Sequence, residues 1–275
     1  MNNKKNILIL LSFLVACGGN NSSFNSEVSS SSESSSLVEL SQIELVEKLK
    51  EEFLTMDDMV SSYSYSIDQE DYYGISIYTS ESGTKSLYLD DFVVTEFTQK
   101  IGKDSILGRK EYGLSEPTAM GSKIYEILYF GEGDEANKVT YYANNDYNKS
   151  YFFDLSFANE YVNNILNVTL SYFSEGEAGL HLETNFAEID LMSDGEKTLQ
   201  YKFVSYSPDG KTKIEEVERE DIIVIENHRI ISCLTDMKYS LHDGVNYQRM
   251  EKSINYEYED LISYSGEKLD YRQFE

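Results

Sequence analysis

A series of turn-forming clusters in the second half of the chain constrains the fold more than any other feature. They lie at residues 174–176, 193–195, 208–210, 226–228 and 242–244. Three of them contain an Asp-Gly pair, which favours tight hairpins. We therefore predict a meander of long antiparallel strands over residues 168–258. Strands this long and numerous must twist and curl, so we expect an open, half-barrel-like sheet with a concave side.

Alternation within these segments indicates which side chains face inward. Leu199, Tyr201 and Phe203 alternate with polar residues, as a half-buried strand requires. A second apolar-leaning face comprises Ile231, Cys233, Thr235, Met237, Tyr239 and Leu241. Because no His or second Cys lies near it in sequence, Cys233 is predicted to be a small core residue rather than a reactive thiol.

The first half of the chain also shows strand patterns, although they are shorter. They span residues 63–68, 73–78, 87–97, 123–130, 138–142 and 151–153. Ser82-Gly83 is interpreted as a hairpin turn before the strand at 87–97. The stretch 101–121 is rich in glycine and contains Pro117, so we predict a loop there with at most one short strand.

Two helices are predicted beside the sheet. In the first, over residues 37–60, Ser41 and Glu44 have the capping-box spacing. Its apolar stripe consists of Leu45, Leu49, Phe53, Met56 and Val60. We expect this amphipathic helix to pack on the sheet. A second, shorter helix is predicted after Ser156, with Phe157, Tyr161 and Ile165 facing inward. The fold class is α+β, as one domain over residues 37–275 with a possible sub-boundary near 155–167.

The N-terminus has the three parts of an export signal. Lys4 and Lys5 precede an apolar run too short to span a bilayer stably, and a small residue comes before the expected cut. The sequence Leu14-Val15-Ala16-Cys17 resembles the lipobox of bacterial lipoproteins. That resemblance implies a signal peptide over residues 1–16 and a Cys17 that receives a diacylglyceryl group and becomes the new N-terminus. The alternative is an ordinary secretory signal with a coincidental Cys.

Residues 17–36 are expected to form a lipidated, Ser-rich, flexible tether. They contain too little apolar surface to offset the entropy of ordering. Two or three acyl chains hold a protein at a membrane durably, whereas one chain binds reversibly. We therefore expect an extracytoplasmic protein anchored through Cys17 in the outer leaflet of the plasma membrane, or in the outer membrane of a two-membrane cell.

The charge of the chain excludes some classes of partner. It has 23 Lys and Arg against 49 Asp and Glu, a net charge of −26. Such a charge repels phosphate backbones and anionic lipid surfaces, so nucleic acid is not an expected partner and membrane attachment falls to the lipid.

No catalytic or metal-binding constellation is predicted. Ser82 and Lys85 match a bare Ser-x-x-Lys pattern without its companion motifs, and Gly210-Lys211-Thr212 lacks the first glycine of a phosphate-binding loop. The histidines, which have no ligand spacing, are His181, His228 and His242. A hydrolase using His242 and Asp243 is the least favoured hypothesis, and no cofactor or metal is expected.

Tyrosines recur along the predicted strands, with 23 in the whole chain. Examples are Tyr63, Tyr65, Tyr141, Tyr142, Tyr201, Tyr206, Tyr256 and Tyr258. A tyrosine can place its ring on an apolar surface and its hydroxyl in water. The tyrosines either line a ligand-binding face or simply cover a half-exposed sheet, the favoured interpretation.

The order of elements resembles that of half-barrel lipoprotein carriers and mycobacterial lipid-binding lipoproteins. In those proteins a curved sheet and inserted helices enclose an apolar cavity for acyl chains. The resemblance implies a non-enzymatic protein that binds a lipid or another apolar molecule. The alternative is a structural or adhesive surface protein with a macromolecular partner. A cavity lined by Leu49, Phe53, Leu199 and Phe203 would favour the first hypothesis, and a packed core with an exposed aromatic patch the second.

Overall fold

A computed structural model describes residues 41–56, 59–116, 123–130, 138–143, 150–174, 179–207, 210–241 and 246–274. The chain divides into two units, Met1–Glu39 and Leu40–Glu275, and all described residues belong to the second. The expected signal peptide, Cys17 and the Ser-rich tether therefore lie outside the described residues.

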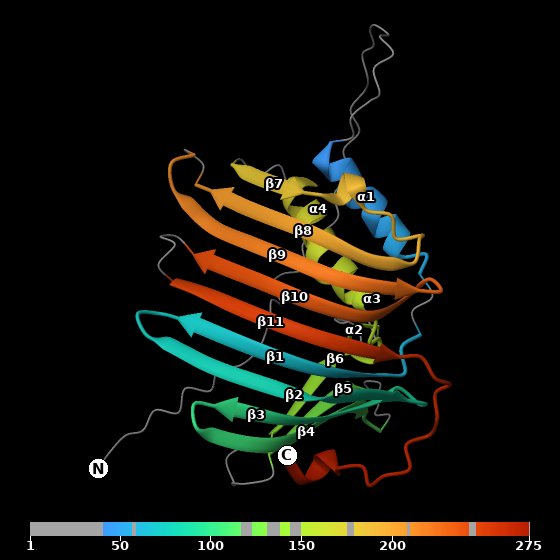
Figure 1. Cartoon of the computed structure of the whole chain (residues 1–275). Helices are drawn as coiled ribbons and strands as arrows, with labels where there is room; N and C mark the ends of the chain where they lie inside the picture. Colours follow the sequence, from blue (N-terminus) through green and yellow to red (C-terminus); the bar gives the residue numbers. More distant parts are fainter. Residues whose placement is uncertain are drawn as a thin grey trace, which may run out of the picture. The chain divides into compact units, whose positions relative to one another are not determined.

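The described strands form one open antiparallel sheet of eleven strands (Figure 1). In chain order they are β1 (Ser62–Tyr72), β2 (Ser76–Tyr88), β3 (Phe92–Ile101), β4 (Asp104–Leu114), β5 (Lys123–Phe130), β6 (Lys138–Ala143), β7 (Leu180–Thr184), β8 (Gly195–Tyr206), β9 (Lys213–Glu226), β10 (Arg229–Leu241) and β11 (Asn246–Glu257). In space β6 and β7 are the two edges, so the sheet does not close. The prediction of a long antiparallel sheet is confirmed.

The last strand joins the two halves of the sheet. β11 pairs along its length with β1, with Tyr72 opposite Tyr247 at one end and Ser62 opposite Glu257 at the other. The meander β1–β6 and the meander β7–β11 thereby become one sheet. Residues 155–167 thus connect two parts of the same sheet.

Helix α1 (Gln42–Phe53) begins with the predicted capping box. The Ser41 hydroxyl accepts from the Glu44 N–H at 3.3 Å, and the Glu44 carboxylate accepts from the Ser41 N–H at 2.7 Å. The helix ends at Phe53, well before residue 60, although Val60 is still buried in the core. It contacts α4 (Asn167–Ser174), a π-helical turn η1 (Val162–Leu166), a 3₁₀ turn η2 (Phe186–Glu188) and β7. Its apolar stripe is therefore buried between other helical segments and a sheet edge.

Two strand predictions in the middle of the chain are wrong, because the residues are helical. α2 (Ser150–Phe153) replaces the short strand, and residues 168–174 belong to α4. α3 (Phe157–Tyr161) begins as predicted at Ser156, whose hydroxyl accepts from the Asn159 N–H at 3.0 Å. The buried positions have helical spacing: Phe157, Tyr161, Val162, Leu166 and Thr169. Burial of this face against the sheet overrides the strand propensity of its aromatic and β-branched residues.

Two predictions in the first half are also wrong, and glycine explains both. Ser82-Gly83 is not a turn but the middle of β2, and the real turn contains Gly74 at φ +82°. A Cβ on Gly83 would lie 2.2 Å from the Glu96 carbonyl oxygen, so glycine permits the close approach of β3. The expected loop after residue 101 is the strand β4, where the Phe97 ring lies over Gly108.

The C-terminal segment covers one part of the sheet on the face opposite the helices. Arg109 and Glu111 form an ion pair on β4, and the Glu111 carboxylate also accepts from the Leu269 N–H at 3.0 Å. Tyr271, in the 3₁₀ turn η3 (Tyr271–Phe274), stacks on Tyr125 with ring centroids 4.7 Å apart. The C-terminal segment therefore covers β3–β5 on this second face of the sheet.

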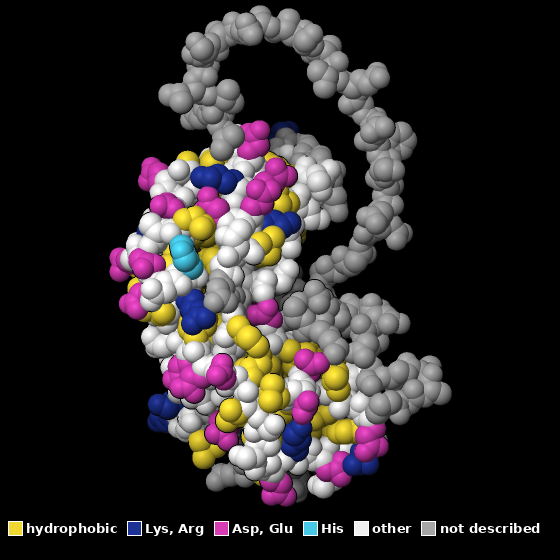
Figure 2. Space-filling model, turned by 90° about the vertical axis from the view of Figure 1, so that its right-hand side faces the viewer, with side chains coloured by type: hydrophobic (Ala, Val, Ile, Leu, Met, Phe, Trp, Pro, Cys, Tyr) yellow, Lys and Arg dark blue, Asp and Glu magenta, His cyan; other side chains and the backbone are white. Residues whose placement is uncertain are grey.

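The surface carries its charges dispersed. Figure 2 shows acidic side chains scattered between basic and hydrophobic ones, not gathered into one patch on that face. No helix in the described ranges is long and apolar enough to cross a bilayer.

Candidate functional site

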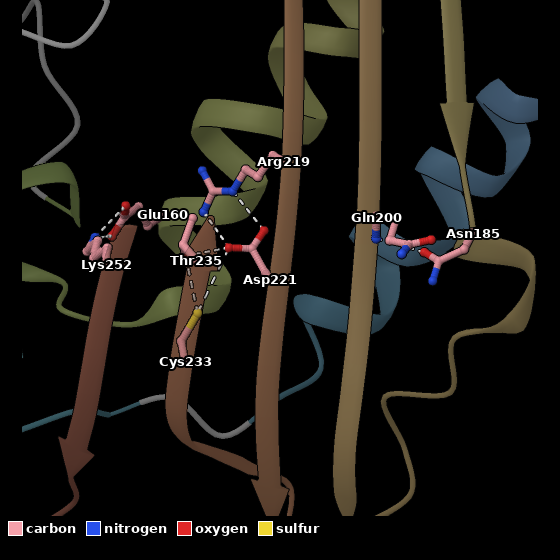
Figure 3. A network of polar contacts seen from close by, with 8 residues as sticks. All are labelled: Glu160, Asn185, Gln200, Arg219, Asp221, Cys233, Thr235 and Lys252. Atoms are coloured by element: carbon pink, nitrogen blue, oxygen red, sulfur yellow. Dashed lines mark hydrogen bonds and ion pairs between the residues drawn. The ribbon is translucent and has the colours of Figure 1, made fainter. Parts of the chain in front are cut away.

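Two polar clusters lie on the face of the sheet that the helices cover. We call the first the ion network: Arg219, Asp221, Cys233 and Thr235, with Figure 3 showing its contacts. We call the second the lysine row: Lys110, Thr95, Lys85, Tyr63 and Tyr256, one residue from each of five neighbouring strands. The ion network follows from strand alternation, because residues two apart on a strand share a face, and the lysine row follows from the register of opposite residues on neighbouring strands.

The carboxylate of the ion network has its donors within the protein (Figure 3). The Arg219 guanidinium donates to both Asp221 oxygens, at 2.7 Å from Nε and 3.0 Å from Nη2. Asp221 is fully buried and also accepts from the Thr235 hydroxyl at 2.5 Å. A buried charge pair is tolerable when its remaining lone pairs are satisfied, as they are here.

Helix α3 packs over the ion network through the ring of Tyr161. The Arg219 guanidinium lies 5.3 Å from the centroid of the Tyr161 ring, a cation–π contact. Burial alone would lower the pKa of Arg219, but the Asp221 carboxylate outweighs it and raises this pKa. Arg219 therefore remains a cation, and its charge is neutralised within the protein.

Cys233 belongs to the same network and is chemically quiet. It is a free, buried cysteine, as predicted, with its sulfur 3.6 Å from the Thr235 hydroxyl. Burial and then the Asp221 charge raise the pKa of the Cys233 thiol to about 12. Since the thiolate is the nucleophile, this residue is unsuited to catalysis.

Two further polar contacts join the helices to the sheet. Glu160 on α3 pairs with Lys252 on β11, with Nζ 3.1 Å from Oε1. The Tyr201 hydroxyl lies 2.8 Å from the Thr169 hydroxyl, which itself donates to the Ile165 carbonyl oxygen at 2.7 Å. These side chains are satisfied and fix the helical layer on the sheet.

The lysine row is built differently. Lys85 on β2 stands opposite Tyr63 on one side and Thr95 on the other, and Thr95 stands opposite Lys110. Tyr63 in turn faces Tyr256, with ring centroids 5.7 Å apart. Side chains directly opposite on neighbouring strands have Cβ atoms about 4.5–5.5 Å apart, so the row is continuous.

The ammonium groups of this row have no ion-pair partner among the described residues. No carboxylate in the described ranges forms an ion pair with Lys85 or Lys110. The contact of Lys85 is the Tyr112 ring, whose centroid lies 5.8 Å from Nζ. Burial, and then the like charge of Lys110, lower the pKa of Lys85 to about 8.

Two hydroxyls near these clusters are buried without a partner in the described part of the protein. They belong to Tyr256, in the lysine row, and to Tyr161 on α3. Burial raises the pKa of both well above the ordinary tyrosine value, so each hydroxyl keeps its proton. An unsatisfied buried donor requires an explanation such as a water molecule or a ligand.

The uncovered face of β7–β11 and β1 bears a shallow depression of about 860 Å³. Two ion pairs lie in it: Lys202 lies 2.6 Å from Glu218, and Arg249 lies 3.1 Å from Asp236. Such exposed pairs contribute little to stability. We place the candidate site on the covered face, because that face holds buried polar groups without partners among the described residues.

The residues proposed to line an apolar cavity are all buried in one core cluster: Leu49, Phe53, Leu199 and Phe203. Phe53 packs 5.4 Å from Tyr161, and Phe203 packs 5.4 Å from Tyr172, measured between ring centroids. The four side chains therefore belong to a packed core, which is the arrangement that we expected to favour a macromolecular partner. Exposed aromatic and aliphatic side chains occur instead around the β1–β2 turn, at Tyr73, Ile75 and Tyr78.

The histidines are dispersed. His181 is exposed and lies 2.8 Å from Glu183, and His228 occupies a turn at φ +61°. His242 and Asp243 lie outside the described residues. Within the ranges that the structure describes, no group of His, Cys, Asp or Glu is arranged to hold a metal ion.

Sequence reasoning missed Arg219 and Asp221, and Lys85 appeared only in a discarded motif. The run 215–221 contains acidic and basic residues, so its sequence resembles that of a solvent-exposed strand. Parity was the available signal, because counting back in twos from the buried Ile223 places Asp221 and Arg219 on the covered face. The same count from Leu87 identifies Lys85.

Neither a protein-family model nor a curated protein matches the sequence. Among solved structures, the chain is similar to a DUF1329 family protein from Desulfovibrio piger, with 10% sequence identity and a TM-score of 0.27. The similarity covers 85% of this chain and 95% of that one. A TM-score this low supports no conclusion about function.

Proposed function

We propose that this chain is a membrane-anchored extracytoplasmic lipoprotein that acts as a non-enzymatic binding protein. Its ligand is a lipid or another apolar molecule held between the sheet and its helices. The observation that carries this proposal is the lysine row, where unpartnered polar groups lie on the covered face among apolar side chains. Sites for small ligands are typically apolar, with a few polar groups that fix orientation.

The proposed architecture is a half-barrel in which the sheet curls around the helical layer. One continuous core supports it, because Ile124 of β5 and Leu199 of β8 belong to the same cluster of buried residues as α1 and α3. The sheet is open, with β6 and β7 as its terminal strands, so entry of a ligand beside the helices would not require strand pairs to break.

Anchoring rests on Cys17 and is tested separately. Cells fed an alkyne analogue of palmitate should label the chain, and the label should be lost in Cys17→Ser. Cys233→Ser is the matched control and should keep the label, because Cys233 is buried. Equal labelling of the chain and of Cys17→Ser would contradict the lipoprotein assignment.

Ligand binding is tested by native mass spectrometry with lipid extraction. The full chain carrying Cys17→Ser is purified from a bacterial host without detergent. We expect a retained lipid near one equivalent. A native mass equal to that of the protein alone, with no increase after incubation with a lipid extract, would contradict the carrier proposal.

The second candidate is a structural or adhesive surface protein. It is supported by Tyr73, Ile75 and Tyr78, which are 60%, 68% and 62% exposed around one hairpin turn. Exposed apolar side chains grouped in this way often mark contact sites for macromolecules. If Tyr73→Ser combined with Tyr78→Ser abolishes attachment of cells to a surface while the lipid content stays unchanged, this function is favoured.

A further inference from the structure

The lysine row contains two half-buried ammonium groups in a protein that has carboxylates in excess. The chain carries 49 Asp and Glu against 23 Lys and Arg. The ion network shows that this fold can satisfy a buried cation with a carboxylate two residues away on the same strand. Scarcity of acidic residues therefore does not explain why Lys85 and Lys110 remain unpaired.

An unpaired lysine within a packed layer costs stability. Transfer of a charge out of water is unfavourable unless an opposite charge or hydrogen bonds replace the water. Burial and the charge of Lys110 both oppose the charge of Lys85, and they lower its pKa toward neutral pH. A residue that lowers stability in the free protein is often kept because a ligand completes its interactions.

The groups beside these lysines suit an anionic headgroup. Tyr256 supplies a buried hydroxyl without a partner, and Tyr63 lies between it and Lys85. Ammonium and phenol groups are donors, and an oxyanion accepts from both.

Apolar side chains flank the row on both sides. One neighbouring line of opposite residues contains Leu87, Val93 and Tyr112, and the other contains Phe97, Gly83, Tyr65 and Ile254. A ligand whose charged group sits on the row would therefore have apolar side chains on either side, of which Val93, Phe97 and Ile254 are already buried.

We propose that the lysine row binds the carboxylate or phosphate group of an amphiphilic ligand. Lys85 and Lys110 supply the positive charge, and the hydroxyls of Tyr256 and Tyr63 donate hydrogen bonds. This inference deepens the proposed function and rests on it, because it assigns the headgroup of the ligand held between sheet and helices.

The charges around Lys85 leave a cationic surplus. The charged neighbours are Lys110 on β4, Glu160 on α3, Lys252 on β11 and Glu126 on β5. Glu160 is already paired with Lys252, and Glu126 has a partner of its own. The ammonium groups of Lys85 and Lys110, which form no ion pair within the described ranges, are therefore available to an anion.

The test measures binding of three probes to the full chain by isothermal titration. The probes are octanoate, octanol and inorganic phosphate, which separate the charge from the hydrocarbon part. The variants are Lys85→Met and Lys110→Met. Lys100→Met is the control, because Lys100 is an exposed lysine on β3.

We expect octanoate to bind in a one-to-one ratio and to lose about tenfold or more in affinity in Lys85→Met and in Lys110→Met, but not in Lys100→Met. Octanoate binding should also weaken about tenfold between pH 7 and pH 9, as Lys85 loses its proton. Octanol should bind more weakly than octanoate and without dependence on either lysine.

The outcomes separate the headgroup from the carrier function. Octanol and octanoate binding equally, with no effect of either lysine, would overturn the headgroup assignment and leave the carrier function standing. Phosphate binding as tightly as octanoate, with the same lysine dependence, would overturn the amphiphile and identify a site for a free oxyanion. Absence of binding by all three probes, with no retained lipid in the native mass spectrum, would overturn both.

Discussion

The ion network and the lysine row occupy the same face of the same sheet, yet they handle buried charge in opposite ways. In the ion network, both oxygens of the Asp221 carboxylate accept from Arg219, and one also accepts from Thr235. In the lysine row, Lys85 meets an aromatic ring, and the Tyr256 hydroxyl lacks a partner among the described residues. The first is paired internally apart from the Tyr161 hydroxyl, which has no partner among the described residues, and the second is the site that we propose for a ligand.

The comparison shows how polar side chains that stabilise a sheet can be distinguished from polar side chains that bind a ligand. A structural cluster stabilises the fold, so removing one member lowers the free energy of unfolding. A functional cluster destabilises the free protein, so removing its charge raises the free energy of unfolding. Stability measurements on matched variants therefore test this difference.

The largest effect is expected for Asp221→Ala. The substitution would leave the Arg219 guanidinium buried without its carboxylate and the Thr235 hydroxyl without its acceptor. We expect a loss of about 3–5 kcal/mol in the free energy of unfolding, measured by urea denaturation. The double variant Arg219→Met with Asp221→Leu should recover most of that loss, because it buries no unpaired charge. A loss below 1 kcal/mol in Asp221→Ala would contradict a closed network.

The next effect has the opposite sign. Lys85→Met should raise the free energy of unfolding at pH 7 by roughly 1–2 kcal/mol, because a partly buried unpaired charge is removed. Lys100→Met should change it little, since Lys100 is exposed.

The pH dependence of that gain follows from the lowered pKa of Lys85. Its pKa is about 8 in the folded protein against an ordinary value of 10.5, so the unfolded chain binds more protons between these values. The cost of Lys85 is therefore full below pH 8 and diminishes as the pH rises toward 10.5. Urea denaturation at several pH values should show the advantage of Lys85→Met shrinking over this range. A constant advantage would show that side-chain packing, not charge, causes it.

Paired and unpaired hydroxyls give a smaller contrast. Tyr201→Phe removes a hydrogen bond to Thr169 and should cost about 1 kcal/mol. Tyr256→Phe removes a hydroxyl without a partner and should be neutral or stabilising by up to about 1 kcal/mol. Thermal unfolding of the two variants tests this contrast, and an equal loss in both would mean that Tyr256 has a structural partner such as an ordered water.

The smallest effect concerns thiol chemistry. Because burial holds the pKa of Cys233 near 12, iodoacetamide should modify it negligibly in the folded protein at pH 8 and fully in urea. In the mature protein from membranes we expect one thiol per chain in urea, since Cys17 is proposed to be lipidated. Two reactive thiols would contradict lipidation, and rapid modification without urea would contradict the closed ion network.

Local patterns predicted much of the fold. The capping box of Ser41 and Glu44 and the cap at Ser156 are short-range interactions, so the sequence contains all the participants. The turn at Asn227 and His228, both at positive φ, follows from residues that favour such turns. Long strands could likewise be inferred from alternation between turn clusters.

The errors arose where distant residues decide the local structure. From sequence alone Gly83 resembles a turn residue, but in the structure β3 packs against it. Residues 168–174 resemble a strand in sequence, but they are helical because the sheet buries Thr169 and the preceding Leu166. The pairing of β11 with β1, across nearly the whole domain, has no local signal at all.

Several properties follow from local sequence alone: the alternation that assigns each strand residue to a face, the helix caps, the net charge of −26 and the lipobox-like start. Which face the helices cover, and hence which charges lose their water, depends on the assembled fold. Arg219 meets a carboxylate there and Lys85 does not. That outcome depends on strand register and on helices from elsewhere in the chain, because burial is a property of the assembled layers and not of any segment.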